Sequence, residues 1–214
     1  MVFSPDQLTF RQDLLADAET VSYNANGGKM RLFVSFSARK NGNCAHIIDY
    51  LRMPEDKIIL FQNLNVKGCG DCDYECFKNQ CKYREDDIYG LLDSFGLYEK
   101  VILVVPMYCG NPSSLYFCFN ERSQDFFLRH GDDYTAFAER LFIIGVYGSR
   151  RETPEFVRCL EKWFEGTAFT DHVLGIERHL YRQGMEDRVT EVEAVRRMLQ
   201  EFLPTDSCPQ SSSL

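Results

Sequence analysis

Hydrophobic positions along the chain fall into short continuous runs, separated by segments in which apolar residues recur every three or four positions. The runs are rich in β-branched and aromatic residues, which is typical of strands buried on both faces of a sheet. We predict strands at 31–37, 58–61, 101–106, 141–148 and, from a weaker pattern, 172–176.

The segments between these runs have the apolar spacing of helices packed on one side. We predict helices at 43–52, 85–95, 111–128, 153–165 and 187–203. In the fourth of these, Thr153 is placed to cap the helix and Pro154 to occupy its first turn. Strand and helix therefore alternate five times, which predicts an α/β fold with a parallel sheet covered by helices on both sides.

The two ends of the chain have a different character. Ser4, Pro5 and Gln7 resemble an N-cap, a first-turn proline and the partner of a capping box, which predicts a short helix at 4–18. The polar, turn-rich segment 22–29 is typical of a linker. We therefore predict a helical extension and linker at 1–29, one domain at 30–203 and a flexible tail at 204–214.

Charge and composition exclude some classes of function. The chain has 214 residues and a formal net charge of -8, with Lys and Arg scattered along it, which excludes sequence-independent binding to nucleic acid or to an anionic membrane. It lacks a run of about 18 apolar residues, and its N-terminus lacks the pattern of a signal peptide. We expect a cytoplasmic protein whose nine cysteines are thiols, not disulfides.

Candidate chemistry follows the first strand. In an open parallel sheet, ligands bind beyond the carboxyl ends of the strands. The segment SFSARKNGNCAH runs from that end directly into a helix, with a hydroxyl at Ser37, a guanidinium at Arg39 and helix amides near Gly42. This set of donors suits a phosphate. An ordinary turn capped by Asn43 explains the same residues, so both interpretations stay open at this point.

Two further strand exits have related features. In PMYCGNPSS, after the third strand, Pro106 fixes the exit and Gly110 allows the backbone to approach a flat ligand. A tight turn capped by Asn111 or Ser113 is the alternative. The fourth strand is followed by YGSRRETPEF, again with a glycine at the exit. Three such exits on one edge predict a mononucleotide site, with phosphate on the first loop and a flat ring beside the others.

The first two of these segments resemble a known family. FVSFSARKNGNCAHIIDYL and VVPMYCGNPSSLYFCFNE resemble the phosphate loop and the segment after the third strand in NADPH-dependent FMN reductases and iron–sulfur flavoproteins. The resemblance spans residues 30–203. It implies a flavodoxin-like, doubly wound, five-stranded parallel sheet of order 2-1-3-4-5 with helices on both faces. It also implies an FMN cofactor, NAD(P)H as co-substrate, and a homodimer or homotetramer.

The resemblance also implies a set of cofactor-binding residues. The FMN phosphate would be held by Ser37, Arg39, Asn41, Asn43 and Cys44. The ring would be approached by Pro106, Met107, Tyr108, Gly110 and Asn111, with Tyr147, Gly148 and Ser149 nearby. The chain departs from the family where Phe36 and Ala38 replace the usual Gly and Pro, and where Cys44 replaces a Thr or Ser. A thiol is a weaker hydrogen-bond donor than a hydroxyl, so we expect weaker FMN binding.

A loop at 67–82 carries KGCGDCDYECFKNQC, in which Cys69, Cys72, Cys76 and Cys81 have the spacing C-x2-C-x3-C-x4-C. Four thiolates in so short a loop suit a compact [4Fe–4S] cluster. Structural zinc knuckles usually have widely separated cysteine pairs, and a dithiol would leave two of the cysteines unexplained. We predict a cluster, with four free thiols on a surface loop as the alternative. The family's more usual spacing is x2, x2, x5, so the third cysteine of this chain is shifted by one position.

Our leading hypothesis is an FMN-dependent oxidoreductase or electron carrier, reduced by NAD(P)H or by a protein donor. Electrons would pass to a small-molecule or protein acceptor. Flavin carries the redox chemistry itself, so no acid–base triad is expected, and the four histidines are scattered along the chain. The alternative is a flavin-free binding or scaffold protein with a flavodoxin fold, which the altered phosphate loop favours.

Overall fold

The computed structural model describes residues 30–204 except 71, 130, 132–133 and 149–154. The helix expected at 4–18, the linker after it and the tail from residue 205 onward lie outside the described residues. So do Thr153 and Pro154, the expected first residues of the fourth long helix.

Within the described residues, five parallel strands form the sheet in the order β2-β1-β3-β5-β6. They are β1 (Arg31–Ser35), β2 (Lys57–Leu60), β3 (Lys100–Tyr108), β5 (Leu141–Tyr147) and β6 (Val173–Glu177). A short strand, β4 (Asn111–Pro112), folds back antiparallel on the end of β3. Numbered without β4, the parallel strands have the order 2-1-3-4-5, so the predicted α/β fold and strand order are confirmed.

The central strand β3 shows why the strands appear in the sequence as continuous apolar runs. Val101, Leu103 and Val105 face one hydrophobic core, whereas Ile102 and Val104 face the other. All five side chains are buried. Because both faces of the sheet are covered, neither face has the polar positions that would produce an alternating pattern.

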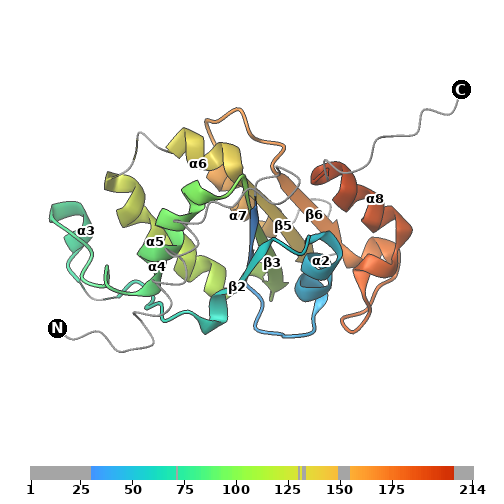
Figure 1. The fold of residues 1–214 in the computed structure, drawn as a ribbon. Coiled ribbons are helices and arrows are strands. Elements are labelled where there is room, and N and C mark those ends of the chain that lie inside the picture. The colour runs from blue at the N-terminus through green and yellow to red at the C-terminus, as the bar shows by residue number, and fades with distance from the viewer. Residues whose placement is uncertain (1–29, 71, 130, 132–133, 149–154, 205–214) are drawn as a thin grey trace, which may run out of the picture.

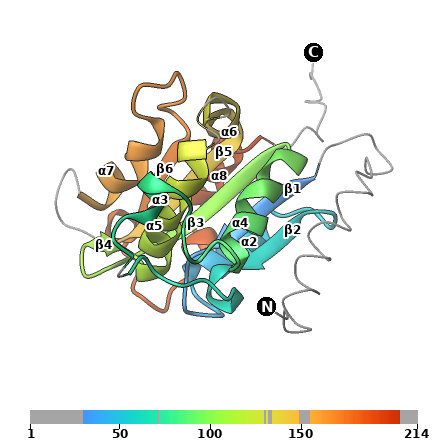
Figure 2. The same ribbon diagram turned by 90° about the vertical axis from the view of Figure 1, so that its left-hand side faces the viewer.

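Helices form a layer on each face of the sheet (Figure 1). One layer contains α2 (Asn43–Leu51) and α8 (Glu193–Phe202), on the right of the sheet in Figure 1. The other contains α4 (Asp87–Ser94), α5 (Ser114–Arg129), α6 (Tyr134–Arg140) and α7 (Glu155–Glu161). A single turn, α3 (Glu75–Lys78), lies in the cysteine loop; it protrudes from this second layer on the left of Figure 1 and lies in front of α5 in Figure 2. Among the described residues, no helix combines the length and apolar composition needed to cross a membrane.

Some helix boundaries differ from those predicted, for local reasons. Helix α5 begins at Ser114 instead of residue 111, because Asn111 and Pro112 form β4. The segment predicted as one helix from 187 to 203 divides into a 3₁₀ turn, η6 (Val189–Glu191), and α8. Helix α6 was not predicted, because its seven residues place only Tyr134, Phe137 and Ala138 against the core, which is too short a pattern to indicate a helix.

Phe36, at the end of β1, anchors the first loop in the core. Its side chain is fully buried among three aromatic rings, with centroid distances of 4.9 to 5.6 Å. Its backbone N–H donates to the Val104 carbonyl at 3.0 Å, and its carbonyl accepts from the Ser113 hydroxyl at 2.8 Å. A residue that departs from the family pattern thus joins β1 to β3 and to the start of α5.

Candidate functional site

A pocket of about 110 Å³ lies at the carboxyl ends of β1 and β3, where the strand order reverses. This is the position at which open parallel sheets bind ligands. The pocket brings together seven residues predicted to bind a cofactor: Ser37, Arg39, Asn43, Cys44, Pro106, Met107 and Tyr108. Its lining is completed by Gly42, Val146, Arg178 and Met185. The loops after the first and third strands therefore meet as expected.

One wall of the pocket is the N-terminus of α2. Gly42 precedes the helix in an extended conformation, and no side chain of the described residues caps it. The first N–H groups of an α-helix have no partner within the helix, and the helix dipole adds positive potential there. Asn43 and Cys44, the first two helical residues, line the pocket. The wall therefore offers backbone donors and positive potential to an anion.

Ser37 and Arg39 stand beside this helix end. The Ser37 hydroxyl is buried in the loop and accepts a hydrogen bond from the backbone N–H of Arg39 at 3.1 Å. The Arg39 side chain is half exposed and lies 3.9 Å from the carboxylate of Glu186, which is almost fully exposed. An exposed ion pair of this kind contributes little to stability. The guanidinium can therefore turn from Glu186 to an anion in the pocket at little energetic cost.

Asn43 does not cap the helix, so that interpretation of the sequence is wrong. It is the first helical residue, and its side-chain oxygen accepts a hydrogen bond from the backbone N–H of Val189 at 2.9 Å. This bond fastens the start of α2 to the turn η6 before α8. The side-chain carbonyl of Asn43 has a structural role, while its backbone lies at the pocket wall.

Cys44 is a buried neutral thiol. Burial raises its pKa to about 12, although a hydrogen bond with the Ser37 side chain acts in the opposite direction. The thiol therefore stays protonated at neutral pH and places no negative charge beside the pocket. As a donor it is weak.

Arg178 lines the pocket without having been predicted from the sequence. It begins the 3₁₀ turn η5 (Arg178–Tyr181), directly after the carboxyl end of β6. Gly148 makes room for it, because a Cβ atom there would lie only 2.6 Å from Arg178 Nη2. Ligands bind beyond the ends of all parallel strands, so Arg178 could have been predicted from its position directly after the fifth strand. The hydrophobic pattern of that strand is weak, and its end is therefore hard to locate in the sequence.

Arg39 and Arg178 give the pocket a positive character on an acidic protein. Among the described residues that line it, none carries a carboxylate. Together with the uncapped N-terminus of α2, the two guanidinium groups form a cationic pocket suited to a phosphate or another small anion.

The loop after β3 is a tight hairpin. Tyr108 pairs with Asn111 across it, and the two residues between them, Cys109 and Gly110, have φ angles of 51° and 85°. A two-residue hairpin with positive φ at both central positions is a type I′ turn, which favours glycine. Gly110 and Asn111 are absent from the pocket lining. The turn itself therefore favours glycine at this position, and the close approach of a ligand to Gly110 stays a prediction.

Among the described residues, the other predicted cofactor-binding residues also lie outside the pocket lining. Asn41 is exposed on the first loop. The Tyr147 ring packs against Phe156 at 5.6 Å between centroids, and burial raises the Tyr147 pKa. Gly148 accommodates Arg178, as described above, and Ser149 lies outside the described residues.

The cysteine loop is fastened to α5 by Arg122, whose side chain is almost completely buried. Its Nη1 donates to the Lys67 carbonyl at 2.6 Å and its Nη2 donates to the Tyr83 carbonyl at 3.0 Å, which are the two ends of the loop. Asp86 pairs with the same guanidinium and accepts a hydrogen bond from the Lys67 backbone N–H at 3.0 Å. A buried ion pair thus fixes where the loop leaves the domain and returns to it.

The four cysteines of the loop are not arranged as one set of metal ligands. Burial raises the pKa of Cys76, with Cys72 and Cys81 adding to the rise, so these three thiols are electrostatic neighbours. Burial also raises the pKa of Cys118 on α5, where Cys69 contributes. Among the described residues, no group of three or more His, Cys, Asp or Glu side chains can hold a metal ion. The loop as folded does not fit the predicted cluster.

Comparison with known proteins supports the fold. No family model and no curated protein matches the sequence. The solved structure of a Trp repressor binding protein from Bacillus subtilis superposes with a TM-score of 0.56 and 12% identity, covering 82% of this chain and 99% of that one. At this identity the likeness shows the fold alone.

Two further solved structures align less closely. A flavone reductase has a TM-score of 0.46 and 16% identity, over 81% of this chain and 60% of that one. The flavoenzyme NAD(P)H:(acceptor) oxidoreductase FerB from Paracoccus denitrificans has a TM-score of 0.42 and 9% identity, over 82% and 93%. Neither alignment is close enough to carry an argument about function.

Proposed function

We propose that this chain is an FMN-dependent oxidoreductase or electron-transfer flavoprotein that accepts electrons from NAD(P)H. The observation that carries the proposal is the cationic pocket, where Ser37, Arg39, Arg178 and the open N-terminus of α2 converge at the switch point of the sheet. A phosphate monoester requires several donors and positive potential from more than one side. These groups supply both.

The pocket fits the phosphate end of FMN better than the whole molecule. Its volume of about 110 Å³ is below the range of roughly 300–1,000 Å³ typical of small-molecule sites. The phosphate would occupy the pocket, while the flavin ring would lie at its mouth against Pro106, Met107 and Tyr108. The side chain of Tyr108 is exposed, so its aromatic face is accessible for stacking.

The residues of the chain would bind and orient the cofactor. Arg39 and Arg178 would neutralise the phosphate, and the Ser37 hydroxyl and the α2 amides would fix its direction. The protonated thiol of Cys44 would add no repulsive charge beside it. Bound flavin supplies the hydride and electron transfer, which no side chain of the protein provides.

Titration of the purified chain with FMN tests the proposal, with quenching of flavin fluorescence as the measurement. Arg39→Ala should weaken binding by about 1.5–3 kcal/mol, the range for a hydrogen bond to a charged group. The matched control is Arg158→Ala, which removes an exposed arginine of α7 that pairs with Glu155 at 3.8 Å. This control should leave the affinity unchanged. Failure of the unaltered chain to bind FMN would favour a flavin-free binding or scaffold protein.

Reduction of the FMN-loaded protein tests the electron donor. NADH and NADPH are added separately in the absence of oxygen, and the decrease in flavin absorption is measured for each. Bleaching by either nucleotide supports an NAD(P)H-linked enzyme. Binding of FMN with no bleaching by either would point to a protein electron donor.

The iron–sulfur cluster rests on the cysteine spacing and on the family resemblance alone. Because the described thiols are not grouped as ligands, we assign no electron-transfer step to a cluster. Iron and sulfide analysis of anaerobically prepared protein decides the question. Stoichiometric iron and sulfide that are lost in Cys72→Ser would establish a cluster, whereas their absence after reconstitution would leave four thiols.

The family resemblance also supports a proposal about assembly. We propose a homodimer or homotetramer, because flavodoxin-like reductases commonly build the flavin site at a subunit interface. Size-exclusion chromatography with light scattering measures the mass directly. A monomer that binds FMN tightly would show that this chain needs no partner copy for its site.

A further inference from the structure

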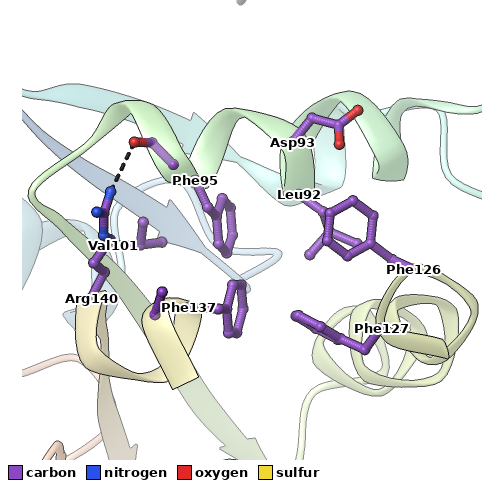
Figure 3. A pocket seen from close by; sticks show the side chains of 10 residues that line it. Leu92, Asp93, Phe95, Val101, Phe126, Phe127, Phe137 and Arg140 are labelled. Atoms are coloured by element: carbon purple, nitrogen blue, oxygen red, sulfur yellow. Dashed lines mark hydrogen bonds between the residues drawn. The ribbon is translucent and has the colours of Figure 1, made fainter. Parts of the chain in front are cut away.

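A second pocket lies at the opposite end of β3, between α4, α5, α6 and the 3₁₀ turn η2 (Phe95–Leu97) (Figure 3). Val101, near the start of β3, lines this pocket, whereas Pro106, near its end, lines the cationic pocket. Val101 and Pro106 are five positions apart along the strand, which is about 16 Å at the rise of a β-strand. The two pockets are therefore distinct sites.

The walls of the second pocket are mainly aromatic. The rings of Phe95 and Phe137 stack with centroids 5.4 Å apart and planes 7° apart. Phe127 meets Phe137 edge-on at 4.6 Å and Phe126 at 5.3 Å. In Figure 3 these four rings surround an open space below α4. We call this cavity the phenylalanine pocket.

The size of the phenylalanine pocket is that of a ligand site. Its volume is about 350 Å³. Protein interiors are close-packed and contain few voids larger than one water molecule, whereas small-molecule pockets span roughly 300–1,000 Å³. A surface pocket of this size, lined by rings, has room for a small apolar group.

The rim of the phenylalanine pocket carries one charge of each sign. Asp93 of α4 and Arg140 of α6 are both among its lining residues. Arg140 Nη1 donates a hydrogen bond to the Gly96 carbonyl at 2.8 Å, which holds the guanidinium at the edge (Figure 3). Asp93 also takes part in another interaction, and in Figure 3 its carboxylate points away from the four rings. Because both charged groups already have partners, the rim favours an uncharged ligand with one group that can form a hydrogen bond there.

We propose that the phenylalanine pocket binds a flat, uncharged aromatic molecule with one hydrogen-bonding substituent. The ring contacts the phenylalanines in offset or edge-to-face geometry, which aromatic pairs prefer. The substituent lies at the rim near Arg140. A saturated ring of similar size fills the space without these aromatic contacts, and so it binds more weakly. The site lies apart from the cationic pocket and does not depend on FMN.

Trp163 provides the measurement. It is the only tryptophan in the chain, and its ring centroid lies 5.6 Å from that of Phe137 and 6.0 Å from that of Phe127. The probe is 4-nitrobenzyl alcohol, a flat uncharged aromatic alcohol whose nitro group quenches indole fluorescence. Titration of the flavin-free full chain should give saturable quenching. Benzyl alcohol should restore the fluorescence by competition, and cyclohexylmethanol should do so much less effectively.

Two variants separate binding in this pocket from binding elsewhere. Ala136→Phe adds a ring to the pocket wall and should weaken the binding of 4-nitrobenzyl alcohol by about tenfold or more. The matched control is Thr135→Phe, at the neighbouring exposed position of α6 outside the pocket lining, and it should bind as the unaltered chain does.

Gly96→Leu is a second filling variant in case Ala136→Phe fails to fold, because a Cβ atom at Gly96 meets nothing within 4 Å. Thermal unfolding confirms that each variant is folded. The proposal is overturned by linear quenching without saturation or by an unchanged affinity in the folded filling variant. Equal competition by the aromatic and the saturated alcohol overturns it as well.

Discussion

The polar residues and glycines that follow the strands at the carboxyl edge of the sheet look alike in the sequence, but they have different roles in the structure. Ser37, Arg39 and Arg178 line the cationic pocket with side chains that carry polar groups. Asn43 uses its side-chain oxygen to hold Val189, and Gly148 leaves room for Arg178. The first three residues are expected to govern affinity for an anion. The other two are expected to govern the position of the groups that bind it.

Arg178→Ala should weaken FMN binding by about 1.5–3 kcal/mol, because it removes one of the two guanidinium groups proposed to bind the phosphate. Calorimetric titration with FMN measures the loss. Arg178→Lys should recover part of it, since a lysine keeps the charge but lacks the planar fork. Arg188→Ala, at an exposed arginine outside the pocket lining, is the matched control. Equal affinities of the Arg178→Ala variant and the unaltered chain would remove Arg178 from the site.

The Cys44 thiol should make the free energy of unfolding depend on pH in the alkaline range. Burial raises its pKa from the ordinary value of 9.0 to about 12 in the folded chain. Above pH 9.0 the unfolded chain therefore binds fewer protons than the folded chain, and the free energy of unfolding falls as the pH rises. Well below pH 9.0 the thiol is protonated in both states and has no such effect.

Cys44→Ala should flatten this alkaline part of the profile, measured by urea unfolding at a series of pH values. Cys69→Ala, which removes an exposed thiol, is the control and should keep the slope of the unaltered chain. An identical slope in the Cys44→Ala variant would show that the buried thiol titrates normally.

At the scale of elements, the cysteine loop and α5 form one unit. Helix α5 buries Arg122, Ser123 and Asp125 as well as aromatic side chains, so part of its packing is polar. The Arg122 guanidinium reaches both ends of the loop and pairs with Asp86, which also caps α4 by accepting from the Ile88 N–H. The loop, α4 and α5 therefore share one buried ion pair.

Arg122→Met should destabilise the fold by about 3–5 kcal/mol, because it leaves the Asp86 carboxylate buried without its partner. Urea unfolding measures the change in the free energy of unfolding. Hydrogen exchange should also quicken at residues 67–83, whose end carbonyls lose their donors. Arg52→Ala breaks an exposed pair with Asp49 at 3.2 Å and should change stability little. A loss in Arg122→Met as small as in that control would show that the loop is held by other contacts.

Elements with a wide apolar face could be predicted from the sequence, and those made by local geometry could not. The five parallel strands and the long helices bury continuous apolar runs or stripes. Strand β4 depends instead on positive φ at Cys109 and Gly110, and cysteine at such a position gives no turn signal. Helix α3 buries no residue, so its four positions carry no periodic pattern.

At the scale of the whole molecule, the sheet order determines which loops meet. The reversal between β1 and β3 brings together Ser37, Arg39 and Pro106, as the sequence predicted. The phenylalanine pocket could not be predicted, because Phe95, Phe127 and Phe137 come from separate segments whose packing no local pattern encodes. The four cysteines are not grouped as metal ligands among the described residues, so a cluster in their loop stays a prediction. Spacing shows how close thiols can come, but the fold of the loop decides where they lie.

The positions of the two pockets predict that they are energetically independent. They lie about 16 Å apart along β3 and share no lining residue, and distant sites without common partners usually contribute additively within about 0.5 kcal/mol. Ala136→Phe should therefore leave FMN affinity unchanged, and Arg39→Ala should leave quenching by 4-nitrobenzyl alcohol unchanged. In the double variant, the change in the free energy of unfolding should equal the sum of the two single changes. A deviation well beyond this limit would mean that the sheet couples its two edges, so that an aromatic ligand at one end would regulate the cofactor site at the other.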